Sequence, residues 1–145
     1  MEDIYYLIHS TNNPECILWN ELKTCYFNTD DQFPGVYMSV ITKDNIESES
    51  IYPGKYLMIF SKILLNQNNY HINARDYNGI IAEENTYYSW NLCEFLDCKN
   101  KCSMNEVIFH DNIDIKYCLR IIDTTGVDYK NLLPKTSLDS PELQP

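Results

Sequence analysis

Short segments in which apolar residues alternate with polar ones, or follow one another, recur along most of the chain. This pattern predicts β-strands separated by turns. We expect strands over residues 3–10, 33–42, 54–65, 70–77, 80–88, 105–111 and 115–122. The dipeptide Asn78-Gly79, typical of a tight β-hairpin turn, lies between the fourth and fifth of these strands. A short turn around residues 112–114 joins the last two.

The first predicted strand is apolar on both faces, so we expect it in the middle of a sheet. A helix signal follows over residues 12–24, where Asn13 can cap the helix and Pro14 suits its first turn. The apolar stripe of this helix would consist of Ile17, Leu18 and Leu22. One early helix and many strands predict an α+β fold with a mostly antiparallel sheet.

The extent of the pattern predicts a single domain. The chain has 145 residues, of which 44% are hydrophobic, enough for one core. The pattern fades from Asp123 onwards. We therefore expect one globular domain over residues 1–123 and a flexible tail over residues 124–145.

The negative charge of the chain narrows its possible partners. The formal net charge is -10, and no cluster of Lys and Arg is present that could neutralise phosphates. Nucleic acids and anionic membranes are therefore disfavoured as partners. No apolar segment has membrane-spanning length, and residues 1–6 lack the basic region of a signal peptide. We expect a cytoplasmic protein with reduced cysteines.

The abundance of Asn, Ile and Tyr beside only two alanines is what an A/T-rich coding sequence produces. A large virus or a protist is a source of such a sequence. For a viral protein, the expected location is the cytoplasm of the infected host cell.

One cluster of possible metal ligands stands out: Cys93, Cys98 and Cys102, with His110 eight residues further on. Structural zinc sites usually take their ligands as closer pairs, so zinc is a minor alternative here. Cys93 also fits a small core residue, and a regulatory disulfide is disfavoured in a reducing compartment. The four glycines are scattered, so no glycine-rich nucleotide loop is present.

Three residues far apart in the sequence lie at strand boundaries or within a strand and could carry chemistry: His9, Tyr37 and Glu106. Each also has a structural interpretation. The histidine could make a hydrogen bond at a strand end, the tyrosine could pack in the sheet, and the glutamate could be solvated at a strand start.

Taken together, their contexts resemble the motifs of the ADP-ribosyltransferase superfamily. The matching segments are His9-Ser10-Thr11, Gly35-Val36-Tyr37 and Glu106, and the resemblance extends over residues 4–122. It points to the branch with a His, Tyr and Glu triad, which includes the poly(ADP-ribose) polymerases. The resemblance implies a split antiparallel sheet, in whose cleft NAD binds as a consumed substrate.

The resemblance also implies a role for each residue. Glu106 would stabilise the oxocarbenium-like transition state in which nicotinamide leaves ribose. His9 would hold a ribose hydroxyl, the backbone at Ser10 would bind the nicotinamide carboxamide, and Tyr37 would stack on the ring. Thr11 and Gly35 complete the two NAD-binding motifs. The acceptor of ADP-ribose would be a protein.

The sequence departs from the family motifs at two positions. Ser10 replaces the usual glycine, and its side chain could crowd the nicotinamide pocket. Met104 stands where many members carry Gln or Glu to select the acceptor. The cysteine cluster would lie in the loop before Glu106, as a loop staple or part of a partner surface.

A second function class therefore stays open beside the transferase. The chain could be a non-catalytic interaction protein that uses its acidic surface and cysteine cluster to bind a protein partner. The sequence leaves the oligomeric state and the identity of the acceptor open.

Overall fold

We describe the fold from a computed structural model of the chain. The residues that it describes are 4–12, 20–24, 35–43, 46–47, 54–67, 69–75 and 104–138. At residues 67, 71–75, 104 and 105 the description is limited to the backbone.

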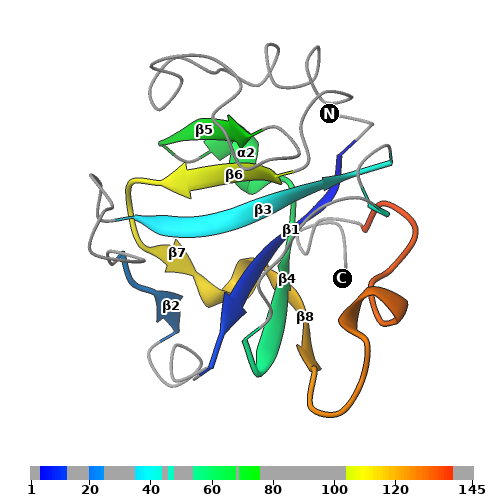
Figure 1. The fold of residues 1–145 in the computed structure, drawn as a ribbon. Coiled ribbons are helices and arrows are strands. Elements are labelled where there is room, and N and C mark those ends of the chain that lie inside the picture. Colours follow the sequence, from blue (N-terminus) through cyan, green and yellow to red (C-terminus); the bar gives the residue numbers. More distant parts are fainter. Residues whose placement is uncertain are drawn as a thin grey trace.

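Among the described residues, six strands form one antiparallel sheet in the order β5-β6-β3-β1-β4-β8. Their bounds are Ile4–Thr11 for β1, Val36–Thr42 for β3, Tyr56–Phe60 for β4, Tyr70–Arg75 for β5, Met104–Phe109 for β6 and Cys118–Asp123 for β8. Figure 1 shows β5, β6 and β3 running across the view, β4 and β8 running down it, and β1 between these directions. The predicted antiparallel sheet is thus confirmed, and β1 lies in the middle of it.

A two-stranded ribbon lies beside the sheet. It consists of β2 (Glu21–Leu22) and β7 (Ile113–Asp114). The helices within the described residues are short: α2 (Leu64–Gln67) and two 3-10 helices, η2 (Ile115–Tyr117) and η3 (Tyr129–Asn131). None of them is long and apolar enough to cross a membrane.

Apolar side chains cover both faces of the sheet. Successive side chains of β1 point to opposite faces and belong to two different hydrophobic clusters. Leu7 belongs to a cluster that includes Leu22 and Ile113 of the ribbon, and we call this side the ribbon face. Tyr6 and Ile8 belong to a cluster that includes Leu133, and we call this side the strap face. A register shift between Ile4 and Tyr6 places Ile4 on the ribbon face as well, where simple alternation predicts the opposite side.

Residues 128–138, which we call the strap, pack on the strap face. Leu133 is buried, and the hydroxyl of fully buried Tyr6 donates a hydrogen bond to the carbonyl of Pro134. The amide of Leu138 donates to the carbonyl of Tyr5 over 3.2 Å. These contacts extend the folded unit past the predicted boundary at residue 123, since at least residues 124–138 are not a separate tail.

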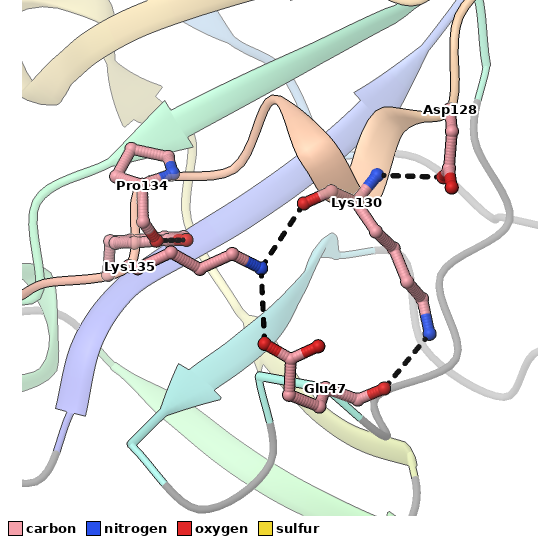
Figure 2. Close-up of polar contacts among 6 residues, drawn as sticks. Glu47, Asp128, Lys130, Pro134 and Lys135 are labelled. Carbon is pink, nitrogen blue, oxygen red and sulfur yellow. Dashed lines mark hydrogen bonds and ion pairs between the residues drawn. The ribbon is translucent and has the colours of Figure 1, made fainter.

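Lysine side chains hold the strap to its surroundings. The ammonium of Lys135 contacts a carboxylate oxygen of Glu47 at 3.3 Å and also donates to the carbonyl of Lys130 (Figure 2). The ammonium of Lys130 donates to the main-chain carbonyl of Glu47. At the end of the strap, Lys62 donates to the Ser137 hydroxyl over 2.8 Å and to the carbonyl of Ile4 over 3.1 Å.

Several predicted elements differ from the structure. Leu22, expected in the early helix, lies in β2, because it pairs with Ile113. The strand expected over residues 54–65 ends at Phe60, where Ser61 begins a turn that leads into α2. The strand expected over residues 115–122 begins with η2. Ile17, Leu18, the Asn78-Gly79 hairpin and the strand over residues 80–88 lie outside the described residues.

Candidate functional site

The sheet opens between β1 and β3. These two strands pair only as far as Ile8↔Ser39. Beyond that point β1 continues along β4 to Thr11↔Tyr56, while β3 begins along β6 at Val36↔Phe109. We call the open end of this pair, residues 9–11 of β1 and 36–38 of β3, the split. The two strands therefore part at the ends that carry the His9 and Tyr37 motifs.

His9 lies at the start of the split and bridges it. Its Nδ1 is 2.9 Å from the carbonyl oxygen of Tyr37. A carbonyl can only accept a hydrogen bond, so Nδ1 carries the proton. Burial lowers the pKa of His9 below its ordinary value, and the hydrogen bond to Tyr37 opposes this shift only in part. The imidazole is therefore neutral at pH 7, and its Nε2 is a hydrogen-bond acceptor.

The accepting Nε2 makes no hydrogen bond within the part of the chain that the structure describes. An acceptor nitrogen held at a strand end can receive a hydrogen bond from a hydroxyl group of a ligand. His9 thus has the tautomer that its expected contact with a ribose hydroxyl requires.

Tyr37 and Glu106 lie on neighbouring strands and on the same face. Tyr37 is opposite Ile108, and Ser39 is opposite Glu106, so Tyr37 and Glu106 are diagonal neighbours. Such neighbours are about 7–8 Å apart, within reach of an aromatic and a long side chain. Both lie on the strap face by alternation, since Ile41 of β3 belongs to that cluster. Tyr37 is buried and Glu106 is partly exposed.

His9 belongs to the opposite side by alternation, because it faces Met58 of the ribbon-face cluster. It reaches the other two residues only through the Tyr37 carbonyl, across the split. Where the three strands are paired, the backbones of β1 and β6 are about 10 Å apart with β3 between them. The fold thus brings Tyr37 and Glu106 together directly, and it connects His9 to them at the point where the sheet opens.

Gly35 allows β3 to start close to β6. A Cβ atom at this position would lie 2.5 Å from Cγ2 of Ile108 and 3.0 Å from the carbonyl oxygen of Phe109. A side chain fits here only if the Ile108 side chain moves away and the Phe109 carbonyl shifts slightly. The contribution of Gly35 is therefore the placement of the strand that carries Tyr37.

Ser10 and Thr11 connect the end of β1 to β4. The hydroxyl of Ser10 accepts a hydrogen bond from the amide of Gly54, and Thr11 pairs with Tyr56. Because neighbours in a strand alternate, the Ser10 side chain leaves β1 on the side opposite to His9. Sequence reasoning missed Gly54, although a Pro-Gly pair at 53–54 precedes β4 as another at 34–35 precedes β3.

Of the other candidate ligands, only His110 lies among the described residues. Within the described residues, no group of three or more His, Cys, Asp or Glu side chains could hold a metal ion. Cys93, Cys98 and Cys102 lie outside the described residues, so the zinc alternative stays a prediction. Met104 pairs with Arg75 at the start of β6.

Comparisons with known proteins give no relative for this chain. It matches no protein-family model, no curated protein and no solved structure.

Proposed function

We propose that the protein is an NAD-dependent ADP-ribosyltransferase that modifies a protein acceptor. One observation carries the proposal. His9, Tyr37 and Glu106 are separated by up to 97 positions in the sequence, yet the sheet order sets their strands side by side as β1, β3 and β6, at the end where β1 and β3 part. A sheet that opens at the motif-bearing strand ends fits the resemblance in the sequence.

Each residue has a task in the proposed reaction. The neutral Nε2 of His9 accepts a hydrogen bond from a ribose hydroxyl of NAD on the ribbon face, and the Tyr37 ring offers a flat surface to nicotinamide on the strap face. NAD therefore binds through the split between β1 and β3. The glycosidic bond breaks with its electron pair going to the nicotinamide nitrogen. The carboxylate of Glu106 stabilises the positive charge that develops on ribose. A nucleophilic atom of the acceptor then bonds to the ribose C1′ and loses its proton to solvent or to Glu106.

The net charge of the protein supports a protein over a nucleic acid as the acceptor. With a net charge of -10, the protein repels the phosphates of a nucleic acid, whereas a basic protein segment is attracted to it. We therefore propose a protein as the acceptor.

The direct test is the release of nicotinamide from NAD by the purified protein. Wild-type protein should release it, and Glu106→Gln should reduce the rate at least about 100-fold, since the variant keeps the shape of the side chain and removes its charge. Glu47→Gln is the matched control, because this exposed glutamate lies in the turn held by the strap. Its rate should equal that of the wild type.

Two outcomes would contradict the proposal. Equal release by wild type and Glu106→Gln would remove Glu106 from the chemistry. Absence of both release and NAD binding by calorimetry would reject the transferase and favour the non-catalytic interaction protein.

A further inference from the structure

The end of β1 is tied to the start of β4 by side chains as well as by the ladder. The hydroxyl of Ser10 accepts from the amide of Gly54, and the side-chain oxygen of Asn12 accepts from the amide of Lys55 over 2.9 Å. Both bonds are made to the two residues that precede β4. The last residues of β1 are thus fixed to the β4 side of the sheet.

The same two residues are held from the end of β8. The hydroxyl of Thr124 lies 2.8 Å from the carbonyl of Gly54 and 2.9 Å from the carbonyl of Lys55. The amide of Thr124 also donates to the carbonyl of Lys55 over 2.9 Å. The ends of three strands therefore meet at Gly54 and Lys55.

Gly54 is packed directly against the backbone of β1. A Cβ atom there would lie 2.7 Å from both the carbonyl carbon and the carbonyl oxygen of Thr11, and 3.1 Å from the amide nitrogen of Asn12. These neighbours are backbone atoms, which cannot rotate away. The close approach leaves little freedom for residues 10–12 to move relative to β4.

We propose that Ser10, Asn12, Gly54 and Thr124 form a clasp that positions His9 for NAD. The clasp fixes the end of β1 at the place where β1 has lost its pairing with β3. With its backbone fixed there, the His9 ring reaches the Tyr37 carbonyl across the split and keeps its proton on Nδ1. Ser10 is then a positioning residue, because it acts through His9, and its serine supplies a hydroxyl that glycine lacks.

The clasp adds a positioning residue to the proposed function, and only its enzymatic test requires that function to be correct. The first measurement needs no NAD. In ¹⁵N-labelled protein, nuclear magnetic resonance reports the His9 tautomer and the rate at which its Nδ1 proton exchanges with solvent. Loss of one hydrogen bond of ordinary strength from the clasp should speed this exchange about fivefold in Ser10→Ala.

Two variants separate positioning from general destabilisation. Ser10→Thr keeps the hydroxyl and should restore slow exchange. Ser137→Ala is the matched control, because Ser137 hydrogen-bonds to Lys62 and Ile4 near the other end of β1. It should lower the melting temperature, as Ser10→Ala does, and leave the His9 signals unchanged.

The enzymatic measurement follows the same variants. Ser10→Ala should raise the KM for NAD about fivefold with kcat unchanged, because a misplaced His9 weakens binding. The clasp is overturned if Ser10→Ala leaves the His9 signals as in the wild type, or if Ser137→Ala changes them equally. Changed signals with an unchanged KM would overturn the positioning role. If the signals change as expected and the wild type releases no nicotinamide, the clasp stands and the transferase fails.

Discussion

Gly35 offers a sharp test of how the motif-bearing strands are placed. The change Gly35→Ala adds one methyl group at a position with no room. The new Cβ would lie 2.5 Å from Cγ2 of Ile108, whereas ordinary contacts between such atoms are 3.4–4 Å. Ile108 is fully buried, so its side chain has little space to move away.

The loss of stability in Gly35→Ala depends on which neighbouring groups must move to make room for the new methyl group. The second close neighbour, the carbonyl oxygen of Phe109 at 3.0 Å, belongs to the backbone of β6. The β3–β6 ladder starts beside it, at Val36↔Phe109. Overpacking of this kind in a filled core destabilises by about 1–3 kcal/mol. For a domain whose whole stability is about 5–15 kcal/mol, the change is readily measured.

Urea denaturation followed by tyrosine and tryptophan fluorescence measures this loss. Gly35→Ala should lower the midpoint without changing the slope. The same experiment in an Ile108→Ala background supplies the control, because that change removes Cγ2. Gly35→Ala should then be less destabilising by at least about 1 kcal/mol.

Two results would refute this reasoning. A loss below about 0.5 kcal/mol for Gly35→Ala would mean that β3 does not start close to β6. Equal losses in the two backgrounds would mean that Ile108 is not the obstacle.

Four further predictions concern pH and the strap. Burial lowers the pKa of His9 below 6.5, so as the pH falls the unfolded chain binds a proton at His9 before the folded protein does. The contribution of His9 to the free energy of unfolding should therefore be full above about pH 6.5 and decline below it. Denaturation measured at several pH values should show a smaller decline for His9→Gln. Burial raises the pKa of Tyr6 above 10, so its contribution to the free energy of unfolding should be present below about pH 10 and lost above it. Tyr6→Phe should remove this loss. At pH 7 it should lower stability by about 1–3 kcal/mol, because the Pro134 carbonyl of the strap loses its hydrogen-bond donor. Leu133→Ala should cost about 2–5 kcal/mol in urea denaturation, whereas a value near zero would mean that the strap does not pack on the sheet. Glu47→Ala should lower the free energy of unfolding by less than about 1 kcal/mol, because the ion pair of Glu47 with Lys135 is exposed. The melting temperature should therefore change little.

The sequence predicts a strand correctly where the residues of that strand alone determine its structure. The run from Ile4 to Ile8 is apolar on both faces, and β1 is indeed central, between β3 and β4. Leu22 fits a helical stripe by spacing, but its partner in the ribbon is Ile113, 91 positions later. A local pattern carries no information on such a distant partner.

The strap and the clasp could not be predicted for a related reason. Residues 124–138 show little apolar periodicity, yet they are held by hydrogen bonds to main-chain carbonyls such as that of Tyr5. The sequence indicates only that the Ser10 side chain could crowd a binding pocket, and it carries no sign that the hydroxyl accepts a hydrogen bond from the amide of Gly54. Contacts between side chains and distant backbone leave no signature in spacing or composition.

The position of the strap has a consequence for how the chain folds during synthesis. β1 is synthesised before its two neighbours in the sheet, which begin only at residues 36 and 56. The strap contacts its first residues last, through Pro134, Ser137 and Leu138. At about 5–20 residues per second, the apolar strap face of β1 stays uncovered for many seconds. β1 is thus made well before the strap that covers it, and until then its apolar strap face is open to binding by a chaperone.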